Sequence, residues 1–175
     1  KLLGSFADME MALVIAIVSI FLILAAQFSS IVKPFIIMMT IPTATIGVIF
    51  GLVVSHNPLG LLSFIGIVSL AGIAVNNGIL LIDFIDRERQ KGKDRVTAVV
   101  DGCKVRFRPI MLTTITAVLC LIPVAVGIAG KSGLWVPLAN AIIWGLSIST
   151  LSVLNVIPAA YLIADDWTSR LAKKS

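Results

Sequence analysis

Charge is the property that this sequence has least of. Only 13% of its 175 residues are charged, whereas soluble globular domains carry about 25% charged residues. Hydrophobic residues make up 58% of the chain, and the mean hydropathy is +1.07. This composition excludes a soluble globular domain and indicates a membrane protein.

Cysteine and histidine are scarce too, with two cysteines and a single histidine. Cys103 and Cys120 are 17 residues apart, which is roughly 25 Å along a helix, so we expect no disulfide between them. The spacing typical of metal-binding cysteines and histidines is absent from the sequence. We therefore expect neither a bound metal nor a cofactor.

The few charged residues are grouped, and they leave uncharged blocks of 22, 49, 22 and 33 residues. A helix needs about 20 apolar residues to cross a bilayer core, so these blocks accommodate five spans. The blocks are apolar on every face, whereas barrel strands alternate apolar and polar residues, so the spans are helices. The sequence therefore predicts an all-α membrane protein, a five-helix transmembrane bundle that forms a single domain over residues 1–175. The predicted spans are 11–28, 34–54, 61–82, 109–128 and 135–164.

Lysine and arginine define the orientation of the spans. Twelve of the 14 basic residues lie on the side that holds the long loop after the third span and the C-terminus. Only Lys1 and Lys131 lie on the other side. The positive-inside rule places the C-terminus in the cytoplasm and the N-terminus outside, a side that would be the periplasm if the chain comes from a bacterium. This orientation and the first residue, Lys1, suggest a fragment of a longer protein.

The long loop is expected to hold a helix of its own over about 94–107. Asp94 can cap this helix, and Val96, Val99 or Val100, Cys103 and Phe107 recur at helical spacing. The pattern predicts an amphipathic helix on the inner membrane surface, and we interpret it as a structural elbow. The basic excess is explained by membrane orientation, so no nucleic-acid partner is expected.

Polar residues inside the spans are the candidate functional residues. Asn76 and Asn77 lie in the third span, and Thr113 lies at similar depth in the fourth, seven residues after Arg106. A contact between Asn77 and Thr113 is expected, and a function or ordinary hydrogen bonding between helices would both explain it. No Asp, Glu, Lys, Arg or His lies deep in a span, so this chain by itself provides no carboxylate for proton transfer. In the second span, Gly47-x-x-x-Gly51 indicates close helix packing.

Three motifs of this chain occur together in one known family. They are GIAVNNGILLIDF at 72–84, RFRPIMLTT at 106–114 and GLWVPLA at 133–139. In order and spacing they make nearly the whole chain resemble the C-terminal membrane region of resistance-nodulation-division (RND) efflux permeases, of the multidrug or hydrophobe/heavy-metal type. The resemblance implies half of a twelve-span fold, in which this chain corresponds to spans eight to twelve.

The resemblance also implies a function, which is not enzymatic. Such permeases are antiporters of the bacterial inner membrane that use the proton motive force to export drugs, detergents, metals or other toxic compounds, and they contribute to multidrug resistance. The implied partners are the N-terminal half with its periplasmic domains, two further copies in a trimer, a periplasmic adaptor and an outer-membrane channel.

The residues that the family uses for proton coupling map onto this chain. By resemblance, Asn76, Asn77, Thr113 and Arg106 are polar partners of two proton-relay aspartates in the fourth span of the other half. Asn76 stands where the best-known multidrug members have lysine, so this chain has no ammonium group there that could change partners when the aspartates are protonated. The resemblance then implies that proton coupling would work through rearranged hydrogen bonds.

Two other functions stay open from the sequence. One is an RND-related protein or lipid exporter, or a half that serves as a scaffold without transporting anything. The other is an intramembrane serine hydrolase, suggested by Gly145-Leu146-Ser147. A serine nucleophile needs a base within reach, and the single histidine, His56, is predicted in a turn of another span.

Overall fold

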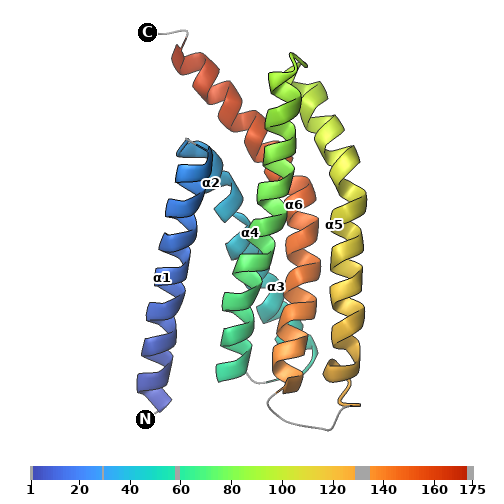
Figure 1. The fold of residues 1–175 in the computed structure, drawn as a ribbon. Coiled ribbons are helices and arrows are strands. Elements are labelled where there is room, and N and C mark those ends of the chain that lie inside the picture. Colours follow the sequence, from blue (N-terminus) through green and yellow to red (C-terminus); the bar gives the residue numbers. More distant parts are fainter. Residues whose placement is uncertain (1, 29, 58–59, 129–134, 173–175) are drawn as a thin grey trace.

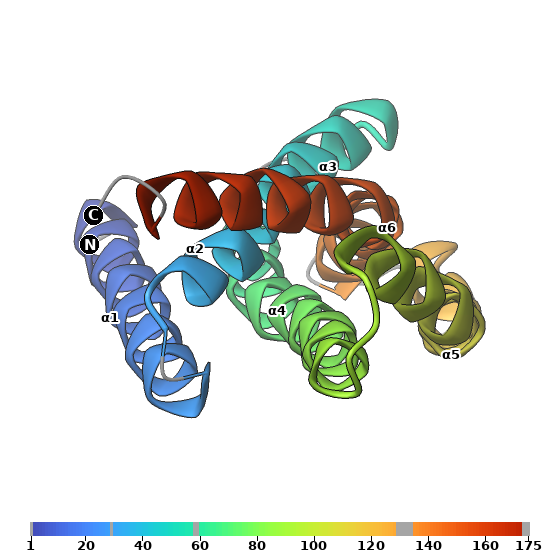
Figure 2. The same ribbon diagram turned by 90° about the horizontal axis from the view of Figure 1, so that it is seen from above.

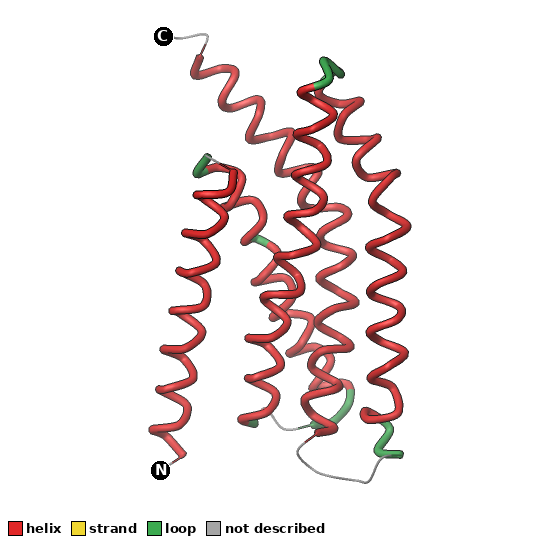
Figure 3. The backbone as a smooth tube through the Cα atoms, in the orientation of Figure 1, coloured by secondary structure: helices red, strands yellow, loops and turns green. Residues whose placement is uncertain are grey.

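Helices account for almost all of the residues that the computed structural model describes, which are 2–28, 30–57, 60–128 and 135–172. In chain order they are α1 (Leu2–Phe28), α2 (Val32–Met38), α3 (Thr40–Val54), α4 (Leu61–Gln90), α5 (Arg95–Ala125) and α6 (Trp135–Ala172). Only short turns join them within the described ranges, which contain no strand (Figure 3). The N-terminus and the C-terminus lie at opposite ends of the bundle (Figure 1).

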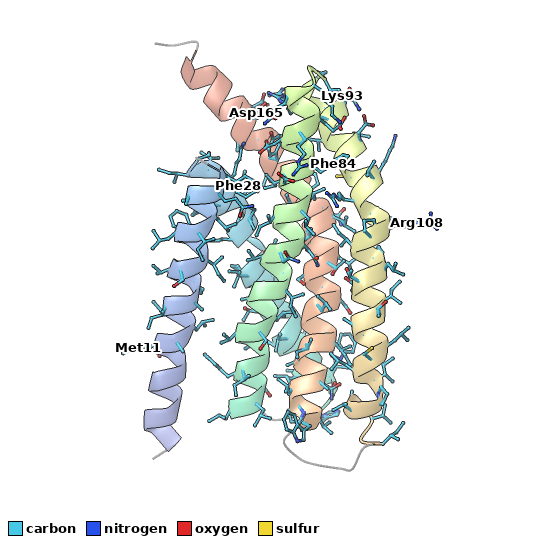
Figure 4. The ribbon with its side chains drawn as sticks, in the orientation of Figure 1. Met11, Phe28, Phe84, Lys93, Arg108 and Asp165 are labelled. Carbon is cyan, nitrogen blue, oxygen red and sulfur yellow. The ribbon has the colours of Figure 1, made fainter. Side chains whose placement is uncertain are left out.

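Five segments of this described part are long and apolar enough to cross a membrane. They are 10–28, 32–54, 61–90, 95–125 and 135–166, so α2 and α3 together make one crossing. This confirms the predicted all-helical fold with five spans. Charged side chains of α4, α5 and α6 gather at the end of the bundle where the C-terminus lies, and we call this the charged end (Figure 4).

The break between α2 and α3 falls at Met39, one turn before Pro42. A proline ring inside a helix clashes with the carbonyl group four residues earlier, which here belongs to Met38. The amide of Met39 is then shared between the carbonyl oxygens of Phe35 and Ile36, both at 3.3 Å. The chain therefore crosses as two helical pieces with a turn between them.

The region predicted as a separate loop helix over 94–107 differs from that expectation. It forms the first turns of α5, which runs without a break through Pro109 to Ala125. The Asp94 side chain does cap this helix, accepting a hydrogen bond from the Val96 amide at 3.3 Å. Val99 is buried, and a Cβ atom on Gly102 would lie 2.7 Å from Ile85 of α4. Close packing on α4 therefore extends the bundle instead of laying this segment along the membrane surface.

The last helix, α6, holds the bundle together because it packs against α3, α4 and α5. In contrast, α1 contacts only α2 and α4 among the described residues and lies at one edge, as the view along the bundle shows (Figure 2). Among the described residues, the contact of α3 with α6 is the most extensive one. Ideal Cβ atoms on Gly47 and Gly51 would lie 2.8 Å from Ile148 and 2.2 Å from Trp144, respectively. The Gly-x-x-x-Gly pattern therefore marks the face of α3 that packs on α6.

Candidate functional site

A groove of about 530 Å³ lies between α4, α5 and α6. The residues that α4 contributes recur at i, i+3, i+4 and i+7 from Ile73, so they share one face of that helix. The groove contains all four of the predicted site residues: Asn76, Asn77, Arg106 and Thr113. Apolar side chains complete it, chiefly Ile73, Leu80, Pro109, Ile110, Ala117, Leu121, Ile142 and Leu146.

The two neighbouring asparagines differ in their surroundings. Asn77 is 7% exposed and lies where the groove meets the core, whereas Asn76 is exposed. Asn76 also lines a second, smaller hollow between α1 and α4, of about 240 Å³. This difference follows from the 100° turn between successive helical residues. Within the described part of the chain neither amide group makes a hydrogen bond, so both keep their donors and acceptors for other partners.

Thr113 lies across the groove from the asparagines, on α5. Its hydroxyl group donates to the Ile110 carbonyl oxygen of its own helix at 2.9 Å. Among the described residues no hydrogen bond joins Asn77 to Thr113, although both side chains line one groove. Threonine in a helix readily bonds back to a carbonyl group three or four residues earlier, which explains this choice.

Thr114, the next residue, has a structural role that the sequence analysis did not assign. It is buried, and its hydroxyl group lies 2.9 Å from that of Thr150 on α6. This hydrogen bond joins α5 to α6 beside the groove. The sequence contained no signal for it, because the pairing depends on how the two helices are rotated against each other.

Arg106 is the one charged side chain in the groove lining that the structure describes, and it lies toward the charged end. Its guanidinium carbon is 5.3 Å from the centre of the Phe84 ring, a cation–π contact between α5 and α4. Its Nε atom is buried and has no hydrogen-bond partner among the described residues. The remaining guanidinium N–H groups can donate to an anion in the groove.

Ion pairs tie the helices together at the charged end. The Asp86 carboxylate accepts from Lys33 of α2 at 2.6 Å and from the Tyr161 hydroxyl group of α6 at 2.9 Å. Lys93 lies between α4 and α5 and is bonded to Glu88 and Asp101, both at 2.7 Å. The hydrogen bonds to Asp101 and Glu88 raise the pKa of the Lys93 ammonium to about 12. Sequence reasoning used these cations only to orient the chain and did not find their partners.

The groove can bind polar groups, and the part of its lining that the structure describes holds no carboxylate or histidine side chain. Its asparagine and threonine side chains can donate and accept hydrogen bonds, and the Arg106 guanidinium group can donate them. The described residues also contain no group of three or more His, Cys, Asp or Glu side chains that could hold a metal ion. This arrangement suits the recognition of a carboxyl group that another part of a protein supplies.

The serine of the hydrolase hypothesis lies in a different, apolar groove. The Ser147 hydroxyl group donates to the Ile143 carbonyl oxygen at 2.7 Å, and no base is among the described residues that line this groove. His56 lies in the turn after α3 with a φ of 51°. The geometry therefore gives Ser147 no activating partner.

Comparisons with known proteins agree with the arrangement of the helices. A family model described as the AcrB/AcrD/AcrF family matches residues 4–165. Two crystal forms of a heavy metal efflux pump are similar in structure, each with 31% sequence identity. Form II gives a TM-score of 0.77 over 86% of this chain, and form I gives 0.72 over 90%. The chain spans about 15% of the length of these pumps.

Proposed function

The chain belongs to the AcrB/AcrD/AcrF family of RND permeases, and from this premise we propose that it is the C-terminal membrane part of an efflux transporter driven by the proton gradient. Its likeness to a heavy metal efflux pump supports a role in transport. We propose metal ions as the first class of exported compound to test, because of this likeness, and drugs as the second. A trimeric assembly in the inner membrane with an adaptor and an outer channel is proposed on the same premise.

We place the proton coupling of this transporter at the groove between α4, α5 and α6. The observation that carries this proposal is that Asn76, Asn77, Thr113 and Arg106 come together in a groove whose described lining has no carboxylate. Carboxyl groups from the other half of the permease would complete the site. An ionised carboxylate would accept from the Arg106 guanidinium group and from an asparagine N–H group.

Protonation would change these contacts in a defined way. A protonated carboxyl group is a donor, and the carbonyl oxygen of Asn76 or Asn77 can accept its hydrogen bond. Its attraction to Arg106 would fall because the negative charge is gone. The same side chains can thus hold both protonation states at different positions. Such a change of partner would allow α4 and α5 to shift relative to the helices that carry the carboxyl groups.

The test uses alanine variants of the complete permease in proteoliposomes. We expect Asn77→Ala and Thr113→Ala to lower substrate transport and coupled proton flux by about tenfold, which is typical of coupling between sites. Both fluxes are measured together, by uptake of labelled substrate and by a pH-sensitive dye in the lumen.

Matched controls are available on the same helix and on α6. Thr116 also bonds back to its own helix, with its hydroxyl group 2.8 Å from the Leu112 carbonyl oxygen, but it is exposed outside the groove. Asn155 on α6 is exposed and bonds to the Leu151 carbonyl oxygen at 2.7 Å. Thr116→Ala and Asn155→Ala should transport normally. Normal coupled flux in Asn77→Ala and Thr113→Ala, at normal expression, would refute the assignment of proton coupling to this groove.

A further inference from the structure

The outer face of α5, which carries Lys104, Arg108, Leu112, Ile115 and Leu119, combines a row of apolar side chains with two cations. Leu112, Ile115 and Leu119 recur at i, i+3 and i+7 and are 65%, 48% and 60% exposed. Toward the charged end, Arg108 and Lys104 lie one and two turns before Leu112 on this face, and both are exposed. In Figure 4 the Arg108 side chain projects from α5 away from the other helices. This face therefore presents an apolar surface that ends in positive charge.

The two cations have no counter-ion in the described part of the chain. Most of the other described cations near this end form ion pairs, including Lys33 with Asp86 and Lys93 with Glu88, and Arg106 lies against the Phe84 ring. Lys104 and Arg108 form neither kind of contact with a described residue. Like charges four residues apart on a helix repel each other. An anion held between these two side chains would remove that repulsion.

An apolar groove of about 290 Å³ begins beside the cations, between α5 and α6. Among the described residues of its lining, the polar side chains are Ser147 and the pair Thr114 and Thr150, whose hydroxyl groups already make hydrogen bonds within the protein. The groove therefore offers little to a polar ligand and suits a hydrocarbon chain. The apolar lining consists of Met111, Ile115, Val118, Leu119 and Leu151.

We propose that an anionic phospholipid binds to this face of α5. Its phosphate group lies between Lys104 and Arg108, and one acyl chain lies in the groove between α5 and α6. Met111, the first groove residue on α5, follows Arg108 by three positions, which is roughly 4.5 Å of helix rise. The guanidinium group of Arg108 can bind two phosphate oxygens, while the Lys104 ammonium group supplies a point charge.

Charge favours a lipid over a helix of a partner protein on this face. Phosphate groups already lie at the edge of the hydrocarbon layer in every leaflet, at the level where a span meets its first charged residues. A partner helix would have to bring its own carboxylate to that level. The proposal concerns a different face of α5 from the coupling groove and does not depend on the proposed function.

The test measures lipid retention by the full-length protein, using native mass spectrometry with dioleoyl phosphatidylglycerol as the added lipid. The double variant K104Q/R108Q should need about 30-fold more of this lipid for half-occupancy, since each cation near an anionic membrane surface contributes a factor of about five and the two factors multiply. The control R87Q/K91Q removes the same charge from cations that are paired with Asp83 and Glu88 of their own helix. It should retain the lipid as the native protein does.

Four outcomes would overturn the proposal. One is an equal loss of lipid in both double variants, which would indicate attraction to net charge alone. The second is equal retention of zwitterionic dioleoyl phosphatidylcholine, which would mean that the headgroup is not recognised. The third is displacement of the lipid by inorganic phosphate, which would mean that the acyl chain is not recognised. The fourth is protection of Leu119→Cys from a membrane-permeant maleimide in lipid-free detergent, which would indicate that protein covers the groove.

Discussion

Replacing Gly51 by alanine tests the contact between α3 and α6 on which the bundle depends. The added Cβ atom would lie 2.2 Å from both Cβ and Cγ of Trp144. Two carbon atoms in contact are about 3.5 to 4 Å apart, so this overlap is more than 1 Å. Cβ belongs to the base of the Trp144 side chain, so the whole residue must move. The Trp144 ring also packs edge-on against the Phe50 ring, with 5.7 Å between the ring centres, and this contact restricts the movement of Trp144.

The expected magnitude combines two opposing effects. Overpacking a helix contact costs about 1 to 3 kcal/mol, whereas alanine in place of glycine inside a helix gains up to about 1 kcal/mol. Gly51→Ala should therefore lower the free energy of unfolding by about 1 to 2 kcal/mol. Gly72→Ala is the matched control, because an added Cβ atom there would meet nothing within 4 Å. That variant should be as stable as the native protein or up to about 1 kcal/mol more stable.

The assay is equilibrium unfolding of the purified protein in mixed micelles, with denaturing detergent as the variable and helical circular dichroism as the signal. A Trp144→Ala background should remove most of the cost of Gly51→Ala, because the clashing side chain is then absent. If Gly51→Ala proves as stable as Gly72→Ala, the close approach of α3 and α6 is not what holds these helices. The reasoning would then be refuted.

Three further predictions use the same unfolding assay. Asp86→Asn should lower the free energy of unfolding by about 2 kcal/mol, because it weakens contacts to two other helices. Asp83→Asn breaks only an exposed ion pair within α4 and should lower it by less than about 1 kcal/mol, so equal losses would contradict this ranking. Thr150→Val should cost about 1 kcal/mol, because the buried Thr114 hydroxyl group loses its partner across the helix contact, and no change would show that the bond is not needed. Lys93→Gln should be less stable than the native protein up to about pH 10, and this difference should vanish as the pH rises through about 12. The reason is that a group whose pKa is raised by folding stabilises the protein at pH values below its pKa in the unfolded chain and no longer does so above its pKa in the folded protein.

The spans could be predicted from sequence because the bilayer imposes a simple requirement. A stretch of about 20 uncharged, apolar residues must be a helix there, so four uncharged blocks led to five spans. The connection before the fourth span could not be predicted in the same way. Whether residues 95–108 lie along the membrane or extend the bundle depends on whether Gly102 meets Ile85, and that contact exists only once α4 and α5 are packed.

The candidate site was predictable in its members but not in its contacts. Asn76, Asn77, Thr113 and Arg106 stand out because polar residues in apolar spans are rare. Their meeting in one groove agrees with the depth expected for two antiparallel helices. Sequence did not indicate that Thr113 bonds to its own helix or that Arg106 rests on Phe84, because both depend on side-chain rotation.

The sequence by itself determined that this chain is a five-span helical membrane protein, and which few polar residues interrupt its spans. These properties follow from composition and order, because the membrane acts on each segment separately. Only the tertiary structure decided which partners those residues have. Asp86 binds Lys33 and Tyr161, and Thr114 pairs with Thr150, because the rotation and crossing of packed helices bring distant positions together. Packing also left Lys104 and Arg108 without a counter-ion among the described residues, on the outer face of α5 at the edge of an apolar groove.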